Sequence, residues 1–161
     1  MARAREVPGF DCDEPFELAA ARVIEVRAGE VFEHSWGVLD LEDIEPVHDM
    51  RVATRRLRTA LEIFEPCFPR KRFRKTLGQV KGLADALGER RDRDVAIESL
   101  ERFAAEAARA DRERLTALIE ELRGEQRAAN DELARLTKPK RLKKLRRNLR
   151  KLVQPLEAAG Q

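Results

Sequence analysis

Aromatic residues are scarce in this 161-residue sequence: it has no tyrosine, one tryptophan and seven phenylalanines, or 5% in all. Runs rich in β-branched and aromatic residues are few, which argues against a sheet. The two cysteines are too few for a disulfide framework and favour a reduced, cytoplasmic setting. No apolar run approaches the roughly 20 residues that span a bilayer, and the N-terminus lacks the apolar core of a signal peptide.

Charged residues are abundant instead, at 39% of the chain, and Ala, Leu, Arg and Glu dominate, which favours helix. The net charge of +3 conceals an asymmetry. Residues 1–50 hold 4 Lys/Arg against 13 Asp/Glu, a net charge of −9, whereas residues 51–161 hold 29 against 17, a net charge of +12. The second part of the chain is therefore expected to attract polyanions.

The pattern predicts one all-α domain over residues 14–156, between a loose arm (1–13) and a short tail (157–161). Pro46 and the possible N-cap Asp43 open the second helix, and Gly88 is a natural end for the third. Asp92 or Asp94 would cap a fourth helix, which could break near Asp111 or continue. We expect helices over 14–39, 46–65, 69–88, 94–111, 112–136 and 140–153. The first five would form a four-helix-bundle core, to which the last is added. Side chains expected to point inward include Trp36, Leu39, Val95, Phe103 and Leu118.

Residues 47–64 carry two parallel stripes when placed on a helix at about 100° per residue. One stripe would face a core, and its members are Val47, Met50, Thr54, Leu57, Leu61 and Phe64. The second stripe is basic and recurs at steps of 3, 4 and 3: His48, Arg51, Arg55 and Arg58.

Such a basic row is unfavourable by itself, because like charges one turn apart on a helix repel by roughly 0.2–0.5 kcal/mol per pair. Only Glu62, one turn further on, relieves it. The next expected helix also begins with cations where its dipole favours acids: Arg70, Lys71, Arg72, Arg74 and Lys75. The row could be a solvated face, pair with the acidic first helix, or bind a polyanion; spacing alone leaves these readings open.

The row belongs to the longer pattern Val-His-x-x-Arg-Val-x-x-Arg-Arg-Leu-Arg-x-x-Leu-x-x-Phe, which resembles the signature of CHAD domains. Further on, residues 87–95 (Leu-Gly-Glu-Arg-Arg-Asp-Arg-Asp-Val) resemble the second signature of that family. The resemblance covers roughly residues 14–137. It implies an α-helical protein that binds inorganic polyphosphate along a basic surface without catalysis. It also implies two similar helical halves, of which one is recognisable here.

The resemblance makes the basic row and later cations candidates for binding phosphate, a task that suits the planar fork of arginine. The candidate polyphosphate-binding residues are His48, Arg51, Arg55, Arg56, Arg58, Lys71, Arg74, Lys75, Lys81, Arg91, Lys140, Lys143, Lys144 and Arg147. We expect Asp92 and Asp94 to cap a helix or orient an arginine, rather than to form an acid–base pair.

The last expected helix lies in a strongly basic stretch, since residues 138–151 hold nine Lys/Arg and no acid beside a seam of leucines. It could bind a polyanion, lie on an anionic membrane surface or be a solvated end helix; we favour the first. Two copies of the chain are expected to pair as a C2 dimer whose basic stripes line one channel. The resemblance adds an association with cytoplasmic polyphosphate granules.

No catalytic residue, metal site or cofactor is expected. The few potential ligands, Cys12, Asp13, His34, His48 and Cys67, lack metal-binding spacing, and no phosphate loop or nucleophile elbow occurs. One alternative is a nucleic-acid-binding module, which the scarcity of stacking aromatics disfavours. Another is a histidine phosphotransfer bundle with His48 as acceptor, but the Lys-Gly that should follow that histidine is missing.

Overall fold

The computed structural model describes residues 3–9, 11 and 13–159, and within these residues it contains helices and no strand. The expected all-α helical bundle is confirmed. Its elements are α1 (Phe16–Glu33), α2 (Glu45–Ile63), a short 3₁₀ helix η1 (Glu65–Cys67), α3 (Arg70–Glu106), α4 (Arg109–Leu136) and α5 (Pro139–Ala159).

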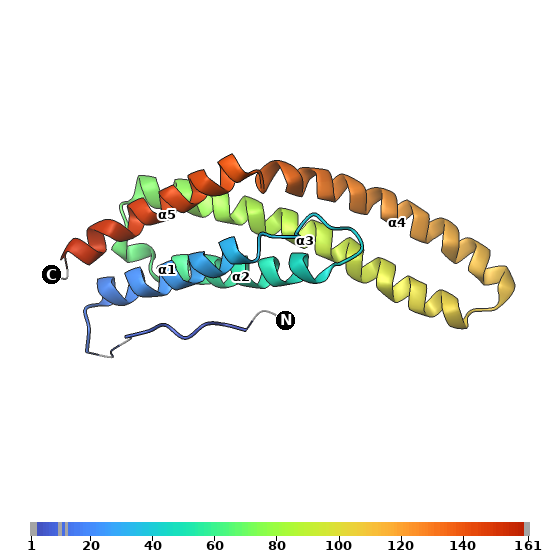
Figure 1. Ribbon diagram of the computed structural model, residues 1–161, viewed down its shortest axis with the longest axis horizontal. Helices are drawn as coiled ribbons and strands as arrows, with labels where there is room; N and C mark the ends of the chain where they lie inside the picture. The colour runs from blue at the N-terminus through green and yellow to red at the C-terminus, as the bar shows by residue number, and fades with distance from the viewer. Residues whose placement is uncertain (1–2, 10, 12, 160–161) are drawn as a thin grey trace.

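Helix α3 is 37 residues long and takes part in both sections of the molecule, the bundle and the projecting hairpin (Figure 1). Its first half packs against α2 and α5, which both pack against α1, so that these four helices form a bundle; its second half pairs with α4. This α3–α4 hairpin projects beyond the bundle, and α4 returns along α3 to lead into α5 (Figure 1).

The apolar stripe of α2 faces the core as predicted. All six of its members are buried, and Leu57 and Leu61 are fully so. Burying a leucine contributes about 1.5–3 kcal/mol, which explains why this stripe orients the helix. Pro46 occupies the first turn, as predicted. Asp43 is not the N-cap, which is Ile44 without a side-chain cap bond; the Asp43 carboxylate instead accepts a hydrogen bond from the Glu45 N–H at 3.1 Å. Because the apolar stripe faces the core, the basic row faces the outside of the bundle.

The predicted break between two helices at residues 88–94 is wrong, because α3 runs without interruption from Arg70 to Glu106. Gly88 lies inside the helix, and neither Asp92 nor Asp94 caps one. Gly costs a helix about 1 kcal/mol relative to Ala, but the side chains around it stay buried at helical spacing. Those buried side chains are Leu87, Arg90, Asp94 and Ile97. Packing against α2 and α4 therefore overrides the local break signal. The turn comes later, at residues 107–108, rather than near Asp111.

Helix α1 ends at Glu33, six residues before the predicted end at Leu39. Gly37 adopts a left-handed conformation (φ 73°) that a helix cannot contain. Trp36, predicted to lie in the core, is 90% exposed, and Leu39 is also exposed. Val38 is buried in their place. The turn reverses the chain here, so the spacing that predicted an inward Trp36 no longer applies.

Helix α5 is part of the bundle core and not an addition to it, which corrects the predicted arrangement. Its leucine seam packs against the other helices, and its buried residues are Leu145, Leu149, Leu152, Val153 and Leu156. The helix also continues to Ala159, into the stretch predicted as a tail. None of the helices in the described part of the chain is long and apolar enough to cross a membrane.

The described part of the N-terminal arm is tied to α1, although a loose arm was predicted. The Arg5 N–H donates to the Glu30 carboxylate, and the Arg5 guanidinium pairs with Glu33. Arg27 donates to the backbone carbonyl of Arg5 at 3.0 Å. Cys12 lies outside the described residues, and Cys67 is a half-buried free thiol.

Three side chains on the α3–α4 hairpin were predicted to point inward, and this prediction is wrong. Val95, Phe103 and Leu118 are all exposed, at 43%, 62% and 42%. Each helix has a single partner there, so only the residues along one seam can be covered. Ile97 and Ile119 are buried in that seam.

Candidate polyanion-binding surface

The predicted arginine row lines a groove of about 500 Å³ between α2 and α3. Arg51, Arg55 and Arg58 come from α2, as the helical spacing requires. The structure also brings four carboxylates to this groove: Glu62 on α2, and Asp85, Glu89 and Asp92 on α3. The groove is therefore a mixed-charge site, which the sequence did not indicate because the α3 acids lie far along the chain.

The three arginines differ in their partners. Arg58 donates to Glu62 at 3.1 Å, and Lys81 pairs with the same carboxylate at 3.3 Å. The hydrogen bond from Arg58, followed by that from Lys81, holds the pKa of Glu62 below its usual value. Arg51 and Arg55 form no ion pair or hydrogen bond with the described residues through their guanidiniums. Within the described part of the chain, two of the three guanidiniums thus have no partner that would compete with an anion, and none of the three pairs with α1.

His48 begins the row and is half-buried. Its imidazole makes no hydrogen bond or ion pair with the described residues. Its position one turn before Arg51 places it on the same side of α2 as the row.

Two other candidates of the central motifs lie apart from this groove. Arg56 lies in a neighbouring depression between α1 and α2, which Arg51 and Arg55 of the row also line, together with Arg27 of α1. Arg91 is half-buried, and its Nη1 atom is enclosed without a hydrogen-bond partner among the described residues. Arg56 therefore lies beside the row on the side toward α1, whereas Arg91 does not line the α2–α3 groove.

Of the candidates in the first half of α3, Lys75 alone lines a second groove, which lies between α3 and α5. Lys71, Arg74 and Lys75 are exposed, and Lys81 is half-buried in its ion pair with Glu62. Lys75 lines a groove of about 330 Å³ between α3 and α5. Its other lining residues are Gly78, Gln79, Gly82, Leu83, Leu136, Arg141, Leu142 and Leu145.

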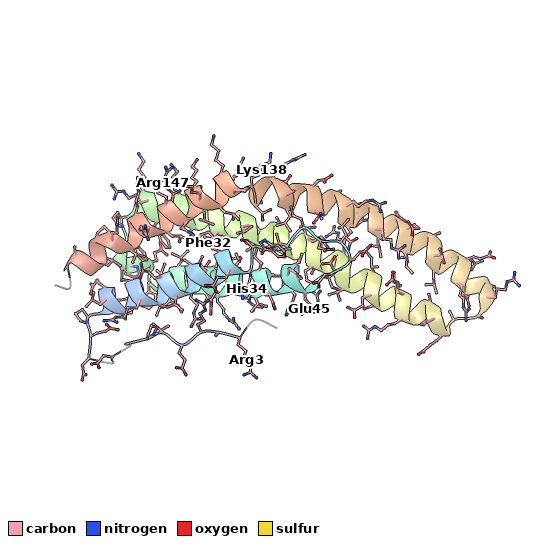
Figure 2. The ribbon with its side chains drawn as sticks, in the orientation of Figure 1. Arg3, Phe32, His34, Glu45, Lys138 and Arg147 are labelled. Carbon is pink, nitrogen blue, oxygen red and sulfur yellow. The ribbon has the colours of Figure 1, made fainter. Side chains whose placement is uncertain are left out.

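The candidates on α5, namely Lys140, Lys143, Lys144 and Arg147, are all exposed. Lys138 and Arg147 lie at the edge of the molecule along which α5 runs, far from Arg3 on the N-terminal arm (Figure 2). Sequence reasoning missed Arg141, which lines the α3–α5 groove. Its spacing from the leucine seam could have identified it as a boundary residue. Arg146 lies on the other side, over the Phe32 ring at 4.4 Å.

The second motif builds a buried polar network. Arg90 is completely buried and donates to Asp94 at 2.9 Å, to Asn130 at 2.6 Å and to the Asp40 carbonyl at 2.8 Å. Gln126 donates to the same Asp94 oxygen at 2.7 Å. Asp94 thus orients an arginine, as expected, but the network joins α3 and α4 to the α1–α2 loop and lies inside the protein. It is a structural device, and no ligand reaches its charges.

The described residues include no group of three or more His, Cys, Asp or Glu side chains that could hold a metal ion. Burial raises the pKa of the Cys67 thiol, which lowers its thiolate fraction and its reactivity. What the surface offers chemically is guanidinium and ammonium groups for binding anions.

Comparison with protein families identifies the class to which this fold and surface belong. The family model of the CHAD domain matches residues 22–161, so the chain is a member of the CHAD domain family. The match extends beyond residue 137, where the resemblance of the motifs stopped, and it includes α5. Among curated proteins, none matches the chain.

Proposed function

We propose that this protein binds inorganic polyphosphate and does not turn it over. The observation that carries the proposal is the charge of α5 and the stretch before it. Nine Lys/Arg and no acid occupy residues 138–151, while the leucine seam of the same helix is buried. Packing explains the leucines but not the cations. Membership of the CHAD family, which is associated with polyphosphate binding in general terms, supports the same ligand.

The physical basis is the release of counterions. Cations that line up along a polyanion displace the small ions condensed on it, so the affinity falls as the salt concentration rises. Arginine adds directional hydrogen bonds, because its fork can contact two phosphate oxygens at once. Base recognition is not required, and the scarcity of aromatic residues disfavours stacking on single strands.

A salt titration of long-chain polyphosphate binding, run beside duplex and single-stranded DNA, tests the proposal. We expect polyphosphate to bind more tightly than either DNA at every salt concentration, with a negative slope of log affinity against log salt. Replacing Arg51 or Arg55 by Ala should weaken binding and flatten the slope by about one contact each. Equal or tighter binding of DNA would favour the nucleic-acid alternative.

The absence of turnover is tested separately. The length distribution of polyphosphate should be unchanged after long incubation with the protein, with and without divalent cations. Release of phosphate at a rate proportional to the protein concentration would refute this part of the proposal.

We further propose that two copies pair as a C2 dimer, with their basic surfaces lining one channel. The support is the two-half architecture that the CHAD resemblance implies, together with the single basic row present in these 161 residues. Light scattering should give twice the chain mass of 18.5 kDa. A strict monomer at high concentration, with and without polyphosphate, would exclude the dimer.

A further inference from the structure

The depression between α1 and α2 has a cationic end and an apolar end, and its volume is about 670 Å³. The two helices run in opposite directions, so that Phe16 at the start of α1 contacts Phe64 directly after α2, with 5.0 Å between the ring centroids (Figure 1). Arg27, in the second half of α1, is therefore level with the first half of α2. All arginines of the lining gather at this end, namely Arg27, Arg51, Arg55 and Arg56.

The other end is apolar. Beyond Thr59 the lining that α2 and its C-cap contribute consists of Ala60, Ile63 and Phe64. Ile63 is 59% exposed, and the Phe16 ring, 52% exposed, extends this end past Phe64. Single exposed apolar residues are ordinary on a protein surface, but a contiguous group of them beside a cationic cluster marks a binding surface.

The cationic end has charge to offer a ligand. Arg27 donates to Glu30 at 2.7 Å and to the Arg5 carbonyl at 3.0 Å, so its charge is already compensated. Arg51 and Arg55 form no ion pair or hydrogen bond with the described residues. None of the described residues that line this depression is acidic. Two guanidinium forks without a counter-charge suit a phosphate monoester, which carries nearly two negative charges at neutral pH.

The order of the two ends along the depression defines the shape of the ligand. From Arg51 to Ile63, α2 advances by about 18 Å at 1.5 Å per residue. Polyphosphate has no apolar part and would leave Ile63 uncovered. An amphipathic helix carries its charges along its whole length and not at one end. A molecule with a charged head and an apolar tail matches both ends at once.

We propose that the α1–α2 depression binds a single-chain anionic amphiphile, an alkyl ester of phosphate. Its phosphate would lie between Arg51 and Arg55, and its alkyl chain over Ala60 and Ile63 toward Phe16. Because the same two arginines are candidates for polyphosphate binding, the amphiphile and polyphosphate compete for them. The competition rests on the proposed function, whereas the amphiphile site does not.

Calorimetric titration with hexyl, octyl and decyl phosphate, each below the concentration at which it forms micelles, tests the site. The affinity should rise with chain length, by up to about fourfold for each methylene, which is the factor for full burial of a CH₂ group. Decyl maltoside, which has the same tail and no charge, should bind about tenfold more weakly than decyl phosphate or worse. Equal affinities for hexyl and decyl phosphate, or for decyl phosphate and decyl maltoside, would overturn the proposal.

Two single variants examine the apolar end without a change of charge. Ile63→Gln should weaken decyl phosphate by about fivefold and leave long-chain polyphosphate within about twofold. Its fold should be retained, because Ile63 is largely exposed. Val95→Gln is the matched control, since Val95 is 43% exposed on α3 and lies outside this depression; both ligands should bind it as they bind the parent. Unchanged binding of decyl phosphate by folded Ile63→Gln would refute the apolar end.

Arg51→Gln with Arg55→Gln examines the cationic end. This double variant should weaken decyl phosphate by about tenfold or more, and in the parent decyl phosphate should lower the apparent affinity for polyphosphate. Decyl phosphate binding that survives the loss of both arginines would refute the placement of the head.

Vesicles of phosphatidylcholine with phosphatidic acid distinguish a dissolved amphiphile from a lipid surface. Sedimentation of the protein with these vesicles, without any binding of dissolved decyl phosphate, would favour a membrane surface and overturn the proposal. Binding of polyphosphate without binding of decyl phosphate would refute this site and leave the proposed function intact. The reverse result would refute the proposed function and leave the site.

Discussion

Removing Asp94 should be among the most destabilising single changes in this protein. Its carboxylate neutralises Arg90, and both side chains are 0% exposed. Asp94→Ala leaves a buried guanidinium without its counter-charge and the Gln126 amide without its acceptor. Breaking one side of a buried ion pair costs about 3–5 kcal/mol. At about 2 kcal/mol/M for a chain of this size, the urea midpoint should fall by roughly 1.5–2.5 M.

Urea unfolding followed by circular dichroism measures the loss of stability. Two further variants serve as controls. Asp92→Ala removes an exposed carboxylate two residues away and should change the stability by less than about 0.5 kcal/mol. Arg90→Met with Asp94→Leu replaces both charges by apolar groups and should be more stable than Asp94→Ala alone. If Asp94→Ala unfolds the chain, Asp94→Asn measures the same interaction with the shape retained. Equal costs for Asp94→Ala and Asp92→Ala would refute the network.

Three further predictions concern the core, the α1–α2 loop and the α2–α3 groove. Leu133→Ala, at a fully buried position, should cost about 2–5 kcal/mol in urea unfolding, whereas Leu118→Ala on the projecting hairpin should cost less than half of that. Trp36 should be quenched by iodide in the native protein nearly as efficiently as in urea, because it is 90% exposed; a strongly protected native signal would contradict its placement. Glu62 has a folded pKa below its ordinary value of 4.5, so its contribution is present above that pH and disappears as the pH falls through the folded pKa. The stability difference between the parent and Glu62→Gln should therefore be visible at neutral pH, at less than about 1 kcal/mol, and vanish in acid; a difference that persists in acid would count against the ion pair.

Local periodicity was sufficient to predict α2, its buried stripe and the outward direction of its basic row. These features depend only on the angle between successive residues of a helix, which is the same in any tertiary context. The leucine seam of α5 was predicted for the same reason. Family membership was also accessible from sequence, because two motifs in order carry it.

Features that depend on neighbouring elements could not be predicted in this way. Gly88 has the local character of a helix end, yet packing against two other helices carries α3 past it. Trp36 has a large apolar side chain of the kind usual in a core, but the chain turns at Gly37 and leaves it exposed to solvent. Sequence indicated which residues are charged and on which side of each helix they lie. Only the tertiary structure decided that the arginines of α2 lie beside the acids of α3, and that Arg141 of α5 lies beside Gly78 and Gly82 of α3. The field in a groove is the sum over both of its walls, and which helix forms the second wall is settled by packing of the whole chain.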